Sequence, residues 1–405
     1  MGLEWFKPRS YRHLDAVVGV GFAQKICDPD FVERHSWLPL IHYVKRIKRY
    51  KKNKNKTVYK DRDIMYPSQR DACILSKYAA DITTKLDKLY VKERLTRNVI
   101  AYRRLGRSNY HFSADAYRFA QENNPCIVLC FDITGFFDNL DHSILKSRLK
   151  ALLDVSELSR DWYAVFRHVT KFSYVDRALI ADRFAASMDS ESHAPIATIS
   201  EIIAAGIPIK KNLNKFGIPQ GTPISAALSN LYMLEVDKEM ARACARFGGL
   251  YQRYSDDILI ICPPDKEAKI ASELHAAVAA HQLEIKKEKT ERAVFGPASD
   301  DIFQYLGFNM SRKGATIRPS SLARQWRKAK HSIATTRMHG EEAIAAGRAE
   351  KIFTKRLRTR FQPVGARNFS KYARRSAEAF GSYQIKRQVL RLERRVDQAI
   401  RDLSK

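Results

Sequence analysis

The sequence predicts an α+β protein in which helices surround a small sheet that carries acidic residues. Asp132 follows the apolar run Pro125–Phe131, and 124 residues later Asp256 lies beside Asp257 inside a second apolar run. Such runs are typical of buried strands. An isolated ionised carboxylate is costly there unless a cation pairs with it. The three carboxylates therefore suggest a site that transfers a phosphoryl group with two metal ions.

Composition indicates a polyanionic partner. The chain has 405 residues, enough for two to three subdomains, and its formal net charge is +28. Nucleic acid is the economical explanation for that much positive charge. The cysteines show neither a Cys-x-x-Cys spacing nor clustering with histidine, so neither a zinc site nor a disulfide framework is expected. They are Cys27, Cys73, Cys126, Cys130, Cys244 and Cys262.

Nothing in the sequence predicts a membrane partner. The segment Met1–Phe6 lacks a basic stretch that leads into an apolar one. No apolar run approaches the length needed to cross a bilayer. We therefore expect a cytoplasmic protein.

The segments before Asp132 predict helices and one strand-like stretch. Residues 1–40 show no clear periodicity, and residues 45–62 hold ten Lys or Arg against the single acid Asp61. Residues 60–67 alternate as a strand does. Helical periodicity follows in three segments: Asp71–Leu89, Asn98–Asn109 and Ser113–Glu122.

The segments after Asp132 predict a further hairpin and a basic helical end. Residues 141–216 indicate helices, with a looser insert at 187–197 and a weak strand near 207–209. Thr222 as N-cap and Pro223 at the first helical position predict a helix through about Ala245. Strands are expected at 250–261 (a hairpin that turns at Asp256 and Asp257), 283–285 and 303–308, and a helix at 384–403. From Ser321 onward 22 Lys or Arg face 7 acids, which favours contact with phosphates.

The order of three motifs carries a family resemblance. Asp132 is followed five residues later by Phe137, then by Pro219-Gln220-Gly221, then by Tyr254-Ser255-Asp256-Asp257. Over roughly residues 60–310 this resembles the palm and fingers of reverse transcriptases. The resemblance implies a right-hand polymerase fold with fingers, a palm with an antiparallel sheet and a helical thumb. The implied parts are 1–125 (N-terminal extension and fingers), 126–310 (palm, with an insert at about 150–215) and 311–405 (basic thumb and RNA-binding region).

The chemistry of nucleotide addition suggests the metal ligands. Mg²⁺ prefers carboxylates and waters, which Asp132 and Asp256 can supply from adjacent strand ends. Asp257 is expected to be a secondary ligand, and Ile133 is included among the expected metal-binding residues. We therefore expect two Mg²⁺ ions and three catalytic aspartates.

The resemblance also implies residues that bind the incoming deoxynucleoside triphosphate (dNTP). Arg62, in a segment similar to the fingertip hairpin, would meet the triphosphate. Phe137 would press against the sugar and exclude a 2′-hydroxyl. Gln220 and Gly221 would lie beneath the nascent base pair, and Lys289 could protonate the leaving pyrophosphate.

Further residues are expected to bind RNA or the duplex. Tyr305-Leu306-Gly307-Phe308 resembles the segment that grips the primer, so Tyr305 and Gly307 are candidates there. Arg356, Arg358 and Arg360 are candidates in the basic C-terminal region.

Two short segments, Trp5–Tyr11 and Ser173–Arg177, resemble bacterial antiviral (defence-associated) reverse transcriptases, most closely their type 2 class. That class works with a structured noncoding RNA, which it copies into cDNA during phage infection. The expected function is thus RNA-directed DNA synthesis on a dedicated noncoding RNA. Two alternatives remain: a retron-like or group II intron-derived enzyme with another RNA partner, or a non-catalytic RNA-binding scaffold on a polymerase fold.

Overall fold

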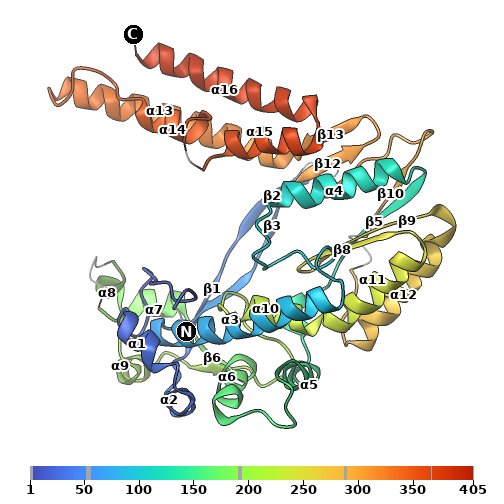
Figure 1. Ribbon diagram of the computed structural model, residues 1–405. Coiled ribbons are helices and arrows are strands. Elements are labelled where there is room, and N and C mark those ends of the chain that lie inside the picture. The colour runs from blue at the N-terminus through green and yellow to red at the C-terminus, as the bar shows by residue number, and fades with distance from the viewer. Residues whose placement is uncertain (1–2, 52–55, 190–193, 287–289, 366, 405) are drawn as a thin grey trace.

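The computed structural model describes residues 3–51, 56–189, 194–286, 290–365 and 367–404. Figure 1 shows three regions. The C-terminal helices, in orange and red, form a layer at the top. The strands that end in acidic residues lie on the right with their covering helices, and the N-terminal helices and residues 141–216 lie below and to the left.

The central sheet carries the acidic residues. Its strands run antiparallel in the order β10 (Glu291–Phe295), β5 (Cys126–Asp132), β9 (Asp257–Cys262) and β8 (Leu250–Tyr254). Successive side chains of a strand point to opposite faces. Ile127 and Leu129 of β5 therefore join one core cluster and Val128 joins another. Burial on both faces explains why the run is continuously apolar.

Helices cover one face of this sheet and build the larger core cluster. The longest of them begins after Ser68, whose hydroxyl accepts a hydrogen bond from the Asp71 amide (3.1 Å) as an N-cap does. These helices are α3 (Gln69–Lys92), α5 (His142–Leu153), α6 (Arg160–Thr170), α10 (Ser225–Tyr232), α11 (Leu234–Arg246) and α12 (Glu267–Ala280). The opposite face packs on α4 (Asn109–Glu122).

A second sheet positions the fingertip hairpin. Its order is β4 (Asp63–Tyr66), β1 (Leu40–Val44), β6 (Ser173–Asp176) and β7 (Lys210–Lys211), with β1 and β6 parallel. Short helices pack nearby: α1 (Val20–Lys25), α2 (Pro29–Glu33), α7 (Arg177–Arg183), α8 (Ala185–Asp189) and α9 (Ile199–Ala204). The antiparallel pair β2 (Ile47–Lys51) and β3 (Lys56–Lys60) connects β1 to β4.

A small antiparallel sheet leads into the C-terminal helices. It contains β11 (Phe303–Tyr305), β12 (Phe308–Ser311) and β13 (Gly314–Ile317). The helices are α13 (Pro319–Ala345), α14 (Lys355–Phe361), α15 (Phe369–Phe380) and α16 (Tyr383–Leu403). α16 buries one stripe of side chains at helical spacing, which explains its clear sequence signal: Ile385, Val389, Leu392, Val396 and Ile400.

The helix predicted at Asn98–Asn109 is wrong. Residues 98–108 form an irregular loop, because their backbone pairs with the edge of β8 instead of with itself. The Arg253 amide donates to Asn98 O (2.7 Å), and the Ile100 amide donates to Arg253 O (3.1 Å). The helix α4 begins only at Asn109.

Other element boundaries also differ from the prediction. Thr222 does not cap a helix, because its hydroxyl bonds the Ser225 hydroxyl (2.5 Å), which in turn donates to Pro219 O (2.6 Å). The helix starts at Ser225 and is interrupted at Met233. The strand expected at 283–285 is only an isolated bridge, and the strand expected at 303–308 is split by the turn between β11 and β12. The strand expected at 207–209 lies at 210–211. Residues 1–40 contain the short helices α1 and α2.

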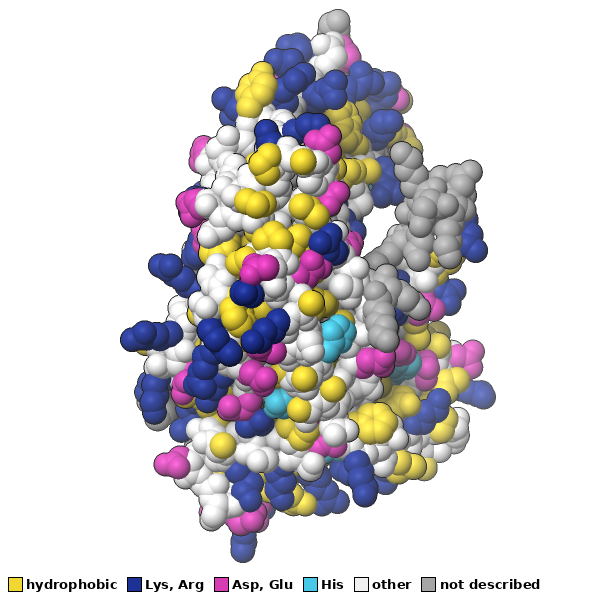
Figure 2. All heavy atoms as spheres, turned by 90° about the vertical axis from the view of Figure 1, so that its right-hand side faces the viewer, with side chains coloured by type: hydrophobic (Ala, Val, Ile, Leu, Met, Phe, Trp, Pro, Cys, Tyr) yellow, Lys and Arg dark blue, Asp and Glu magenta, His cyan; other side chains and the backbone are white. Residues whose placement is uncertain are grey.

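The surface is strongly basic. In the face shown in Figure 2, Lys and Arg side chains gather at the upper end, at the height of the C-terminal helices in Figure 1, and again along the left and lower edges. No helix in the described ranges is long and apolar enough to cross a membrane.

Candidate active site

The predicted aspartates converge at one edge of the central sheet. Asp132 is the last residue of β5 and Asp257 the first of β9, and the two are directly opposed in the strand register. Asp256 occupies the turn between β8 and β9. Its carbonyl accepts a hydrogen bond from the Ile133 amide (3.2 Å), so the chain beyond β5 is joined to this turn. Antiparallel pairing of β5 with β9 thus brings together carboxylates that are far apart in sequence.

One carboxylate of the turn, Asp257, has a raised pKa. Asp257 borders an open hollow, and the surrounding protein partly shields its carboxylate from water. This partial burial, with the neighbouring charge of Asp256, raises the pKa of Asp257 to about 6 despite Lys60, Arg318 and Arg62 nearby. A carboxylate with a raised pKa beside a second acidic residue favours a bound cation.

The aspartates are suited to divalent ions whose remaining ligands are substrate oxygens. No three acidic, His or Cys side chains within the described residues lie together as a closed metal cage. Mg²⁺ sites that act on phosphates typically use one or two carboxylates, with waters and phosphate oxygens as the remaining ligands. Asp132 and Asp256 at adjacent strand ends meet that need.

A hollow of about 450 Å³ opens in front of the aspartates. Cationic side chains line it from two parts of the chain. Lys60 and Arg62 lie at the base of the β2–β3 hairpin, and Arg318 lies directly before α13. The hollow therefore brings together six of the predicted site residues. They are Arg62, Asp132, Asp256, Asp257, Tyr305 and Gly307.

Tyr305 and Gly307 border the hollow differently. Tyr305 is only 4 % exposed, and burial raises the pKa of its phenol. Its hydroxyl has no hydrogen-bond partner among the described residues. Gly307 lies in the tight turn between β11 and β12 with φ +97°, which favours glycine. At this turn the hollow is therefore bordered by the backbone of Gly307, whereas the Tyr305 ring is almost fully buried.

Phe137 lies near the sheet edge on a short turn, η2 (Phe136–Asn139). Phe136 is buried, whereas Phe137 is only partly buried and its ring centroid lies 5.4 Å from that of Phe136. The Ile218 amide donates to Phe137 O (2.9 Å), which ties this turn to the Pro-Gln-Gly segment. The Phe136 ring therefore lies in the core, whereas the Phe137 ring keeps a partly exposed surface.

The Pro-Gln-Gly segment packs against the strand that follows Arg62. The Met65 amide donates to Gln220 O (2.9 Å). Gly221 has φ +124°, and a Cβ there would lie 2.7 Å from Met65 O. Glycine is required because the two backbones approach too closely for any side chain. Gln220 and Gly221 do not border the hollow in front of the aspartates.

The remaining predicted residues lie elsewhere. Ile133 is buried beside the sheet edge, and Arg356, Arg358 and Arg360 lie on α14 in the thumb, away from the hollow. Lys289 lies outside the described residues.

Sequence reasoning missed two cations that face Asp257. Lys60 lies in the basic stretch before Arg62, so its alternation with Arg62 on an extended segment could have identified it. Arg318 had no sequence signal, because the fold of the β11–β13 sheet alone brings it to the hollow.

The fold and this site together define a right-hand polymerase. Residues 72–310 match the family model described as "Reverse transcriptase (RNA-dependent DNA polymerase)". The match covers more than half of the chain, and the chain belongs to that family. Enzymes of that family are RNA-directed DNA polymerases, a class of nucleotidyltransferase.

Solved structures that a search finds similar to the chain include telomerases. The apo telomerase of Candida tropicalis truncated from its C-terminal domain is 13% identical over 67% of this chain (TM-score 0.45), and the apo telomerase of Candida tropicalis is 14% identical over 67% (0.43). The Candida albicans telomerase with a fragment of telomeric RNA is 12% identical over 94% (0.45). The alignments cover 53%, 47% and 65% of those chains. A comparison with curated proteins gave no match.

Proposed function

We propose that this reverse transcriptase copies a dedicated, structured noncoding RNA into cDNA and acts in bacterial antiphage defence, in the cytoplasm. The observation that carries the proposal is positive charge outside the hollow. More than half of the net charge of +28 lies after Ser321, and no described residue of that segment borders the hollow. A cleft that holds only a short duplex does not need such a surface. A folded RNA held outside the cleft does.

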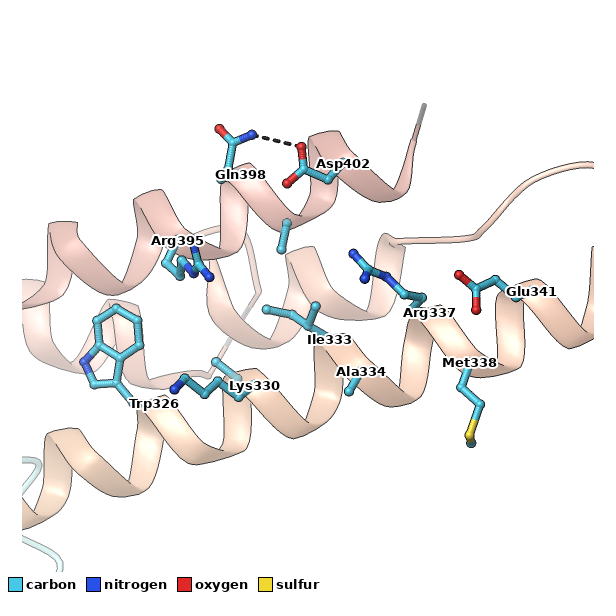
Figure 3. Close-up of a pocket in the computed structure, with 12 residues that line it drawn as sticks. Trp326, Lys330, Ile333, Ala334, Arg337, Met338, Glu341, Arg395, Gln398 and Asp402 are labelled. Atoms are coloured by element: carbon cyan, nitrogen blue, oxygen red, sulfur yellow. Dashed lines mark hydrogen bonds between the residues drawn. The ribbon is translucent and has the colours of Figure 1, made fainter.

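The thumb offers surfaces suited to RNA. α14 buries Leu357 and Phe361 in the thumb core, so its three arginines are exposed. Cations beside an aromatic ring are typical of surfaces that bind single-stranded nucleic acid. Such a combination borders a second hollow, of about 400 Å³, between α13 and α16 (Figure 3). Its lining includes the Trp326 ring and the cations Lys330, Arg337 and Arg395.

The resemblance to defence-associated enzymes supports the biological part of the proposal. Its two segments lie in the fingers. Tyr11 donates its hydroxyl to Pro67 O (2.8 Å) beside β4, and Ser173–Asp176 forms β6 of the same sheet. Both segments brace the sheet from which the fingertip hairpin extends.

The residues of the site would divide the work of nucleotide addition. Two Mg²⁺ ions, held by Asp132 and Asp256 with Asp257 and Ile133 beside them, would stabilise negative charge on the attacking oxygen, the transferred phosphorus and the leaving pyrophosphate. Arg62 would hold the triphosphate by charge-assisted hydrogen bonds.

Further residues would select the sugar and place the base pair. The Phe137 ring would exclude a 2′-hydroxyl by contact with the sugar. Gln220 and Gly221 would contact the nascent base pair from the turn before α10. Lys289 would supply the proton to pyrophosphate.

The experiment that tests the proposal is sequencing of RNA that copurifies with the protein. We expect one defined RNA, strongly enriched over the transcriptome. A thumb variant with α14 neutralised (Arg356→Gln, Arg358→Gln, Arg360→Gln) should lose most of it. A control removes the same charge from other exposed positions and should retain it: Lys25→Gln, Lys92→Gln and Lys269→Gln. A random sample of cellular RNA in the wild-type protein would refute the dedicated partner.

A further inference from the structure

The catalytic turn contains an unusual pair of backbone conformations. Ser255, directly before Asp256, has φ +62°, and Tyr102 in the loop between α3 and α4 also has φ +62°. Residues other than glycine rarely adopt this left-handed region, and they persist there only where surrounding contacts enforce it. The two residues touch, because the Tyr102 hydroxyl and Ser255 Oγ are 3.0 Å apart.

The loop that carries Tyr102 is fixed on both sides of that residue. On one side the Ile100 amide donates to Arg253 O (3.1 Å), and Asn230 Nδ2 donates to Ala101 O (3.0 Å). On the other side Arg103 donates to Asp87 Oδ1 through Nε (2.6 Å). The Tyr102 ring is therefore presented to the turn by anchored backbone, although 46% of its surface is exposed.

A buried ion pair holds the turn from behind. Arg253 is fully buried and donates two hydrogen bonds of 2.7 Å to the Asp237 carboxylate. Its remaining nitrogen, Nη1, donates to Ser255 O (3.1 Å) and to Asn230 Oδ1 (3.2 Å). A buried ion pair adds little net stability, because desolvation of both groups opposes their attraction. Here the pair also fixes the turn, because Arg253 holds Ser255 O as well as Asp237.

The helix after the Pro-Gln-Gly segment joins the same network. Asn230 belongs to α10, and its side chain bonds both the Tyr102 loop and Arg253. One buried amide, that of Asn230, therefore connects two parts of the site. It joins the turn that carries Asp256 to the helix after the Pro-Gln-Gly segment, which is expected to contact the base pair.

We propose that Tyr102 is a positioning residue for nucleotide addition. Its hydroxyl, acting with Arg253, locks Ser255 in the left-handed conformation and thereby directs the adjacent Asp256 toward the hollow in front of β5. Tyr102 does not bind substrate in this account. It acts only through the geometry of the turn.

The test removes single atoms of this contact. Tyr102→Phe should lower kcat for dNTP addition about three- to tenfold, as expected for loss of one hydrogen bond that matters at the reacting geometry. KM for dNTP and Kd for primer–template should stay within about twofold, and the Mg²⁺ concentration for half-maximal rate should rise. Ser255→Gly deletes the partner hydroxyl while it accepts the left-handed backbone without strain.

The double variant and a control distinguish positioning from general stability. Tyr102→Phe combined with Ser255→Gly should be no slower than Ser255→Gly alone, because both changes remove the same contact. The control Tyr117→Phe removes a hydroxyl that bonds Ser311 O (3.2 Å) between α4 and β12. It should leave kcat and the Mg²⁺ dependence unchanged. Wild-type kcat in Tyr102→Phe, multiplicative losses in the double variant, or an equal loss in Tyr117→Phe would overturn the proposal.

Discussion

Neutralising Asp257 should stabilise the metal-free protein at neutral pH. The pKa of Asp257 is raised from 3.8 to about 6 by burial and by Asp256. Folding therefore favours the protonated acid, and its favourable contribution is lost as the pH rises from the unfolded pKa through about 6. A shift of two units corresponds to about 3 kcal/mol. Because Asp257 is exposed to the hollow, screening by water reduces this to about 1 kcal/mol.

Thermal unfolding in a metal chelator measures this effect. At pH 7.5 the variant Asp257→Asn should melt about 1 °C above the wild type, since about 1 kcal/mol is small against the unfolding entropy of a chain this long. At pH 5 the difference should shrink, because wild-type Asp257 is then largely protonated. Added Mg²⁺ should raise the melting temperature of the wild type more than that of the variant, because a ligand stabilises the state that binds it.

A matched control and a clear contradiction complete this test. Asp182→Asn changes an exposed carboxylate on α7 and should show no such pH dependence. If Asp257→Asn melts below the wild type at pH 7.5, or if the difference is the same at both pH values, Asp257 is not the electrostatically strained member of the site.

Three further predictions concern the polymerase reaction. Replacing Asp256 and Asp257 with Ala should abolish DNA synthesis in a primer-extension assay while RNA binding persists, because the loss removes several kcal/mol of transition-state stabilisation; near wild-type synthesis would contradict the site. Phe137→Ala should admit ribonucleotides in single-nucleotide extension, and unchanged discrimination by a folded, active variant would show that this ring is not the gate. Arg62→Ala should raise KM for dNTP about tenfold, as expected for a lost charge-assisted contact worth about 1.5–3 kcal/mol. The control Arg46→Ala removes an exposed pair with Asp61 and a contact with the Tyr59 ring, and it should leave KM unchanged. An equal rise of KM in both variants would argue against a specific triphosphate contact.

The elements predicted correctly from the sequence are those whose pattern of apolar residues matches their burial in the fold. β5 and β9 were predicted because both of their faces are buried, which makes these runs apolar, and the aspartates at their ends stood out against that background. α3 and α16 were predicted because each buries a stripe at helical spacing.

The missed features depend on contacts between distant segments. Residues 98–108 have a helical pattern, but hydrogen bonds to β8 hold them in a loop. Arg318 reaches Asp257 only through the packing of other elements. The buried pair of Asp237 and Arg253 gave no signal either, because a sequence alone does not show which charged residues are buried together.

The central claim is that one dedicated RNA is copied at this site. The most direct measurement supplies dNTPs and Mg²⁺ to the protein purified with its own RNA and sequences the DNA formed. The account predicts cDNA that maps to one internal portion of the copurified RNA. It also predicts that the Asp256→Ala and Asp257→Ala double variant carries the same RNA but forms no cDNA. The account is contradicted if cDNA maps to no preferred template, or if the double variant produces it as well.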